Sequence, residues 1–293
     1  MYTHDHGSFD PGHILLDALT DTAWMLPFLF LAYLAIETIE RRQGARVERL
    51  LARGGRFGFA VGAVLGVVPQ CGFSTMAAGF YASRVITLGT LLAVFLSTSD
   101  EAIPLMLAQP NSWPALALLI GCKLVWALVV GLLVDILLRR AIPQGLRGGY
   151  GGGAAVDCHH HEEQDGILLA AAKHTANIVL IIFGFTFAFG LLVGLVGEAR
   201  VEQFLLALGP FQPLVAGLFG LIPNCASSVL LTQLYLEGSI SFGSVLAGLN
   251  CNAGIGLLVL FRTNRSLRQN LFILGLLVAA GVLPGLALHL FGV

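Results

Sequence analysis

The sequence has little charge and almost no lysine. Asp, Glu, Lys and Arg together make up 11% of its 293 residues, against 56% for the hydrophobic set. Soluble domains carry roughly 25% charged residues, so this composition indicates that most of the chain lies in lipid. We therefore expect the lipid bilayer as a partner and no nucleic acid.

Motifs for several other functions are missing as well. The two lysines, Lys123 and Lys173, do not follow a phosphate-binding loop of the G-x-x-x-x-G-K-[ST] type. We therefore expect no ATP hydrolysis, no cofactor, and an ion gradient as the energy source. Residues 1–6 lack the basic region and cleavage site of a signal peptide, so we expect them to stay on the mature protein. The five cysteines do not suggest a disulfide framework.

Long apolar stretches are present instead. A bilayer is crossed by about 20 apolar residues in a helix. One of the stretches contains Lys123 and Asp135, which need partners or water if they lie in lipid. Stretches of this length predict simple spans at residues 22–39, 114–138, 178–196 and 271–293.

The two halves of the sequence align without a gap at one offset of 154 residues, which separates Pro69 from Pro223. At this offset Val-Val-Pro-Gln-Cys (67–71) falls on Leu-Ile-Pro-Asn-Cys (221–225). A two-fold repeat with matched Pro-polar-Cys breaks is typical of secondary transporters, whose substrate sites form where the repeats meet. The repeat therefore predicts a transporter.

Two pairs of segments have breaks near their centres. Residues 56–81 and 211–235 are each two apolar runs of about a dozen residues, divided at Pro69 and Pro223. A helical run of that length rises about 18 Å, half a membrane, so each pair of runs predicts a hairpin.

The second pair of segments is long enough to span but has a polar centre. Residues 86–108 contain Ser-Thr-Ser-Asp-Glu (97–101), and residues 240–261 contain Asn-Cys-Asn-Ala-Gly (250–254). These sequences predict broken helices. Irregular backbone at membrane depth is tolerated only inside protein or along a cavity, so we expect the four breaks to share a polar centre near the midplane.

Arginine positions give the orientation. Thirteen of the fourteen arginines lie in the connections 41–56, 81–85, 139–166 and 262–270, which are cytoplasmic by the positive-inside rule. The exception is Arg200, whose repeat partner Arg46 lies inside, so the repeats are inverted. We predict an all-α integral membrane protein with two inverted-topology repeats of five helical segments each and both termini extracytoplasmic. Its expected divisions are an N-terminal tail (1–13), repeat 1 (14–140), a cytoplasmic Gly/His-rich linker (141–166) and repeat 2 (167–293).

The candidate substrate or metal ligands are the polar and thiol side chains at these breaks. An ionisable group at the bilayer centre costs at least about 2.5–3.5 kcal/mol, so Asp100 and Glu101 are predicted functional residues. The alternative for Asp100 is that it caps the second half-helix. The full set is Gln70, Cys71, Asn224 and Cys225 at the hairpin tips, and Asp100, Glu101, Asn250, Cys251 and Asn252 in the broken spans.

These ligand types do not name the ion. Thiolates favour soft ions, whereas carboxylate and amide oxygens favour hard ions such as Mn²⁺. Cys71 and Cys225 occupy matched breaks, but a buried cysteine is also a common small core residue, which is the interpretation we give to Cys122. Three thiols around one point, Cys251 included, would also suit a trivalent arsenical.

The linker contains a short tract rich in histidine. By composition it favours auxiliary capture of metal, and the alternative is a flexible polar connector, because the preceding residues 148–153 are mostly glycine. The tract's candidate ligands are His159, His160, His161, Glu162 and Glu163.

Four motifs and the histidine tract together resemble the ten-transmembrane heavy-metal exporter family, whose members carry labels such as manganese transporter or arsenic efflux protein. The resemblance covers nearly the whole chain and implies ten helices and export of a metal or metalloid. The motifs are Val-Pro-Gln-Cys-Gly-Phe-Ser (68–74), Ser-Thr-Ser-Asp-Glu-Ala-Ile-Pro (97–104), Ile-Pro-Asn-Cys-Ala-Ser-Ser (222–228) and Gly-Leu-Asn-Cys-Asn-Ala-Gly (248–254).

We therefore expect a secondary active transporter in the inner (plasma) membrane of a bacterium or archaeon. It would export a heavy-metal cation, Mn²⁺ or a similar divalent metal, by proton exchange at Asp100 or Glu101. One alternative is an arsenite or organoarsenical efflux permease. Another is an intramembrane metal- or thiol-dependent enzyme, although no histidine lies in the mid-membrane breaks to act as base. A metal-responsive receptor and a homodimer are also left open.

Overall fold

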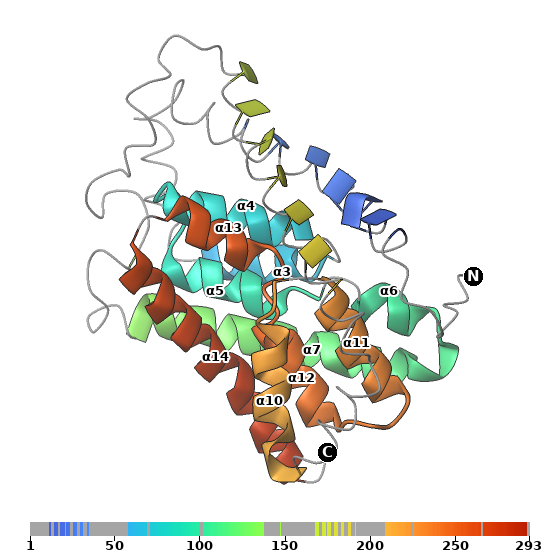
Figure 1. Ribbon diagram of the computed structural model, residues 1–293. Helices are drawn as coiled ribbons and strands as arrows, with labels where there is room; N and C mark the ends of the chain where they lie inside the picture. The colour runs from blue at the N-terminus through green and yellow to red at the C-terminus, as the bar shows by residue number, and fades with distance from the viewer. Residues whose placement is uncertain are drawn as a thin grey trace.

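The computed structural model describes six stretches of the chain and some isolated positions. Within them every regular element is a helix, and no strand occurs. The described residues are 58–68, 71–99, 102–137, 147, 209–223, 225–264 and 266–291, with separate helical positions between 12 and 34 and between 168 and 191. The prediction of an all-helical protein is confirmed for these residues (Figure 1).

Four helical segments among the described residues are long and apolar enough to cross a membrane. Two of them match the predicted simple spans at 114–138 and 271–293, and the other two match the predicted broken spans. The remaining predicted spans, 22–39 and 178–196, lie largely outside the described residues. The four segments are Leu88–Leu107, Trp113–Ile136, Phe242–Thr263 and Leu267–Leu290.

Helices in the two halves start at matching positions. Gln212 begins α10 and Gly58 begins α3, which are separated by 154 residues, and the next four pairs of helices have the same separation. The first half contains α3 (Gly58–Gly66), α4 (Cys71–Ala82), α5 (Leu88–Ser97), α6 (Ala102–Leu107) and α7 (Trp113–Leu132) with a π-helical turn (Leu133–Leu137). The second contains α10 (Gln212–Gly220), α11 (Cys225–Leu236), α12 (Phe242–Cys251), α13 (Gly256–Thr263) and α14 (Leu267–Leu290).

Matched caps start α5 and α12. The hydroxyl oxygens of Thr87 and Ser241 each accept the N–H three residues later, at 3.2 Å. A side chain from the long helix of the same half completes each cap. The carboxylate of Asp135 accepts the Thr87 hydroxyl at 2.5 Å, and Nδ1 of His289 lies 2.7 Å from the Ser241 hydroxyl. Asp135 thus has the partner that a charge in an apolar span requires.

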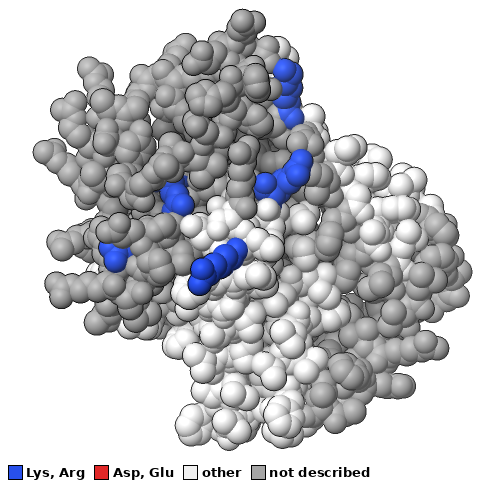
Figure 2. All heavy atoms as spheres, turned by 60° about the vertical axis from the view of Figure 1, so that its left-hand side comes forward, with Lys and Arg blue, Asp and Glu red and all other residues white. Residues whose placement is uncertain are grey.

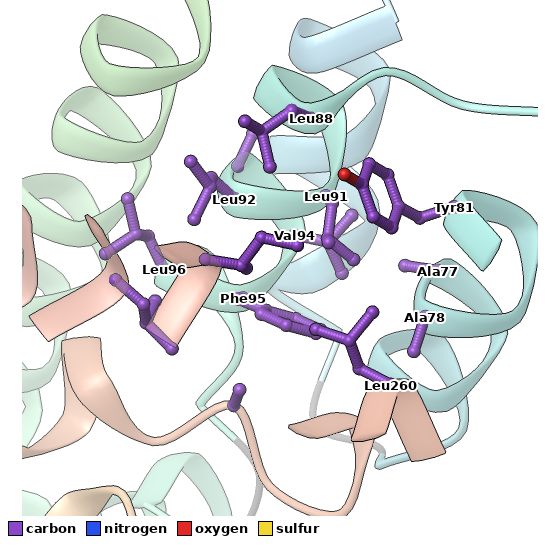
Figure 3. Packing of buried hydrophobic residues seen from close by; sticks show 14 of the residues in the cluster. Ala77, Ala78, Tyr81, Leu88, Leu91, Leu92, Val94, Phe95, Leu96 and Leu260 are labelled. Carbon is purple, nitrogen blue, oxygen red and sulfur yellow. The ribbon is translucent and has the colours of Figure 1, made fainter. Parts of the chain in front are cut away.

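α5 and α12 form the centre of the structure, because all ten residues of each are buried. α5 packs against α3 and α7, and α12 packs against α10 and α14. Contacts also cross between the halves, since α4 packs against α13 and α11 packs against α6 (Figure 1). Figure 3 shows one such region, where Tyr81 and Ala78 of α4, Phe95 of α5 and Leu260 of α13 meet.

The outer helices expose apolar side chains. In the spanning segments that contain α7 and α14 only 33% of the apolar window is buried, against 81% and 89% for the segments around α5 and α12. Figure 2 shows lysine and arginine side chains gathered on one part of a face, beside a white surface without charge. Outward apolar faces of this kind are suited to contact with lipid. The described basic residues other than buried Lys123 are Arg84, Arg147, Lys173, Arg262 and Arg268.

Candidate functional site

The break between α12 and α13 has a local cause in the sequence Asn-Ala-Gly. α12 ends at Cys251, and Asn252 follows with its side-chain Oδ1 accepting the N–H of Gly254 at 2.8 Å. Gly254 has a φ of 54°, in the left-handed region that glycine adopts most easily. An Asx turn followed by a left-handed glycine ends the helix, and α13 begins again at Gly256.

Two hydroxyl groups next to the break after α5 bond back to the backbone of that helix. The Ser97 hydroxyl donates to the carbonyl of Ala93 at 2.8 Å, and the Thr98 hydroxyl donates to the carbonyl of Val94 at 2.7 Å. The side chains of Ser97 and Thr98 are both buried. Asp100 and Glu101, the candidate ligands of this break, lie outside the described residues.

A buried lysine reaches the open end of α12. Lys123 in the middle of α7 is fully buried, and one partner of its amino group is the carbonyl oxygen of Leu249 at 2.6 Å. In a continuous helix this carbonyl would accept the N–H of Ala253, but that N–H bonds to the carbonyl of Cys251 at 3.0 Å. The helix break therefore releases the carbonyl that Lys123 binds.

A second donor on the same face of α7 acts in a similar way. Trp126 donates its indole N–H to the carbonyl of Ala280 in α14 at 2.6 Å. Four residues later stands Pro284, which has no N–H to give to that carbonyl. Sequence reasoning identified Lys123 as needing a partner but missed Trp126. The sequence did contain a signal for such a contact, because a proline inside an apolar helix leaves the carbonyl four residues earlier without its backbone donor.

The side-chain oxygen of Asn250 receives no hydrogen bond from the described part of the chain. The side chain is fully buried, and its Nδ2 donates to the carbonyl of Gly281 at 3.4 Å. Its Oδ1 is buried as well and has no partner among the residues that the structure describes. A buried acceptor in this state costs about 1–3 kcal/mol. The oxygen is therefore available to a cation or to a donor on a substrate.

Cys251 occupies a tightly packed position. Its Sγ would lie 2.5 Å from a Cβ added to Gly281 and 3.4 Å from one added to Gly217. The sulfur thus fills the space between α14 and α10, and the side chain is fully buried. In this conformation Cys251 packs as a small apolar residue.

Packing brings the start of α4 close to the break in the other half. A Cβ on Gly256, the first residue of α13, would lie 2.7 Å from the backbone oxygen of Ser74. Ser74 is in the first turn of α4, which begins at Cys71, so the start of α4 lies beside the α12–α13 break. The described residues include Pro223, half-buried in the turn after α10, but not Pro69, Gln70, Asn224 or the side chains of Cys71 and Cys225.

Residues 159–163 of the linker also lie outside the described part of the chain. Among the residues that the structure does describe, no group of three or more His, Cys, Asp and Glu side chains could hold a metal ion. The described portion of the candidate site therefore consists of amide and backbone oxygens, hydroxyls, the thiol of Cys251 and one ammonium group.

Apolar helices that contain breaks with buried polar groups define the protein as a multi-span helical membrane protein. The family model ArsP_2, described as "Putative, 10TM heavy-metal exporter", matches residues 13–202 and 185–292. The chain belongs to this family, which confirms the resemblance found in its motifs. Comparison with curated proteins gives no match, and neither does comparison with solved structures.

Proposed function

We propose that the protein is a secondary active transporter that exports a divalent heavy-metal cation, Mn²⁺ or a similar ion, in exchange for protons. The observation that carries this proposal is the unpartnered Oδ1 of Asn250, fully buried beside the carbonyl end of α12. Carbonyl and amide oxygens are suited to hard cations, and the C-terminal end of a helix carries partial negative charge.

Two inverted repeats would provide the moving parts. The five helix pairs with one spacing and the matched caps at Thr87 and Ser241 support a repeat in the fold. Contacts between α4 and α13 and between α11 and α6 support an arrangement in which the repeats meet around the breaks. Rocking of one repeat against the other would then expose the site to each side in turn.

Carboxylates would complete the site. The two charges of a divalent cation need compensation in a low-dielectric centre, and Asp100 and Glu101 directly follow the described end of the α5 break. Gln70, Asn224, Cys71 and Cys225 at the hairpin tips are the further proposed ligands. The linker histidines would capture metal on the cytoplasmic side without taking part in translocation.

The packing of Cys251 favours a hard cation over an arsenical. A trivalent arsenical would need three converging thiols, but the sulfur of Cys251 is held between Gly217 and Gly281. The equivalent residue of the first half is Ser97, an oxygen ligand type. Cys251→Ser should therefore leave Mn²⁺ flux largely intact, and loss of arsenite flux alone in this variant would favour the arsenical instead.

The test is uptake into sealed proteoliposomes with Mn²⁺, Zn²⁺, Cd²⁺, Fe²⁺ and arsenite, with and without a pH gradient. We expect metal flux that depends on the gradient, and we expect Asn250→Leu and Asp100→Asn to abolish it while the protein still folds. The position equivalent to Asn250 in the first half is Leu96. Asn250→Leu therefore removes an unsatisfied acceptor and introduces the side chain that the other half has at the same position. Metal binding without flux would indicate a receptor, and wild-type flux in both variants would place the site elsewhere.

A further inference from the structure

A fully buried lysine in the middle of an apolar membrane helix needs a reason. Lys123 has no exposed surface, whereas Lys173, the other lysine of the chain, is exposed. A lysine near the end of a span can extend its amino group to the membrane surface, but a lysine in the middle of α7 cannot. An ionisable residue at this depth is costly and marks a functional site by default.

The amino group lies where a transported cation would be attracted. Its nitrogen is 2.6 Å from the carbonyl oxygen of Leu249, a short distance that fits an ammonium donor. This carbonyl belongs to the last turn of α12, where partial negative charge gathers. The next residue, Asn250, presents the Oδ1 that lacks a donor. Ammonium and metal cation would therefore compete for the same end of the helix.

The two broken spans differ at this point. At the end of α5 the hydroxyls of Ser97 and Thr98 bond back to the carbonyls of Ala93 and Val94, one turn earlier in the same helix. At the end of α12 a long side chain from the other half of the protein binds the carbonyl of Leu249. The position equivalent to Lys123 in the second half is Leu277, which is uncharged and so cannot bind the end of α5 in the same way. Among the described residues, the α12 break is therefore the one whose end carbonyl is bound by a positively charged side chain, and that side chain can move away.

α7 is also held without help from Lys123. Trp126, one turn along the same face, bonds independently to the carbonyl of Ala280. The flexible four-carbon stem of a lysine can change rotamer while its helix stays in place. Release of the ammonium group from Leu249 thus needs no displacement of α7.

We propose that the ammonium group of Lys123 is a tethered substitute for the substrate, which occupies the carbonyl end of α12 in the empty transporter and is displaced when the cation binds. This inference rests on the proposed function, since it concerns the same site. It means that the empty site keeps a positive charge against the α12 carbonyls, and that the affinity for metal is limited by competition with this charge.

Metal binding by the purified full-length protein in detergent tests the competition. Lys123→Gln keeps a donor for Leu249 but removes the charge, and it should bind Cd²⁺ and Mn²⁺ at least about tenfold more tightly, since a neighbouring like charge is lost. Lys123→Arg keeps the charge and should not gain affinity. Lys173→Gln removes one exposed lysine charge and is the matched control, expected to bind as the wild type does.

A second measurement uses the wild-type protein and does not depend on how the Lys123 variants fold. Labelling lysine with ¹³C at Cε gives two NMR signals, which Lys173→Gln assigns. Titration with diamagnetic Cd²⁺ should shift the Lys123 signal in proportion to occupancy and leave the Lys173 signal in place. Cd²⁺ binding that leaves the Lys123 signal unchanged, or unchanged affinity in Lys123→Gln, would overturn this inference but leave the proposed function standing. Absence of binding and flux for every ion in the wild type would instead defeat the proposed function.

Discussion

Trp126→Phe is expected to destabilise the packing of α7 on the second half of the protein. The indole N–H is the donor for the carbonyl of Ala280, at 2.6 Å. Pro284 supplies no N–H to that carbonyl, and lipid provides no water in its place. A buried acceptor left without a donor costs about 1–3 kcal/mol. Phenylalanine keeps most of the buried ring, so the lost hydrogen bond should dominate.

Pro284→Ala tests whether the missing backbone donor is the cause. In this background residue 284 has an N–H again, and in a regular helix that group bonds to the carbonyl of Ala280. Trp126→Phe should then cost less than it does in the wild type. The difference should be about 0.6 kcal/mol and at most about 1.7 kcal/mol, as interhelical hydrogen bonds show in membrane double-mutant cycles.

The assay is reversible unfolding of the wild type, both single variants and the double variant in one detergent, followed by circular dichroism. Trp113→Phe is the control, because the indole of Trp113 donates to the carbonyl of Leu107 at 3.2 Å in an exposed position. That variant should lose little stability. Equal costs of Trp126→Phe in the two backgrounds would refute the role given to the proline.

Two further predictions concern the proposed topology and the linker. With cysteine-free protein in intact cells, a cysteine at position 198 should be labelled from outside and one at position 44 only after permeabilisation. External labelling of both would remove the inverted arrangement. Asn111 is the better outside position near α7, because it is exposed whereas the side chain of Ser112 is buried and bonded to the carbonyl of Met106. Changing residues 159–161 to alanine should weaken the apparent affinity and leave the maximal rate largely intact, and complete loss of flux in a folded triple variant would give these histidines a larger role.

Much of the local structure could be predicted from the sequence. The length and apolar character of residues 114–138 and 271–293 correspond to α7 and α14. Asn-Ala-Gly at 252–254 predicts the end of α12, because the Asx turn and the left-handed glycine are properties of those residues. The family could also be recognised from its short motifs, since each motif is continuous in the chain.

The contacts between distant segments could not be predicted in this way. A carbonyl released by Pro284 or by the α12 break is a backbone group, so nothing in the sequence says which side chain will reach it. Lys123 and Trp126 both could have turned toward lipid, water or either half of the protein. Their partners, Leu249 and Ala280, depend on how α7 crosses α12 and α14.

The sequence by itself determined that this protein is helical, lies in a membrane, has breaks in its spans and belongs to a family of heavy-metal exporters. These properties follow from composition, chain length and local backbone preferences. Only the tertiary structure decided that Cys251 is packed between glycines of two helices while its neighbour Asn250 keeps a free acceptor. Both residues are small, adjacent and buried. Their difference arises because successive helical residues point about 100° apart and so meet different neighbours.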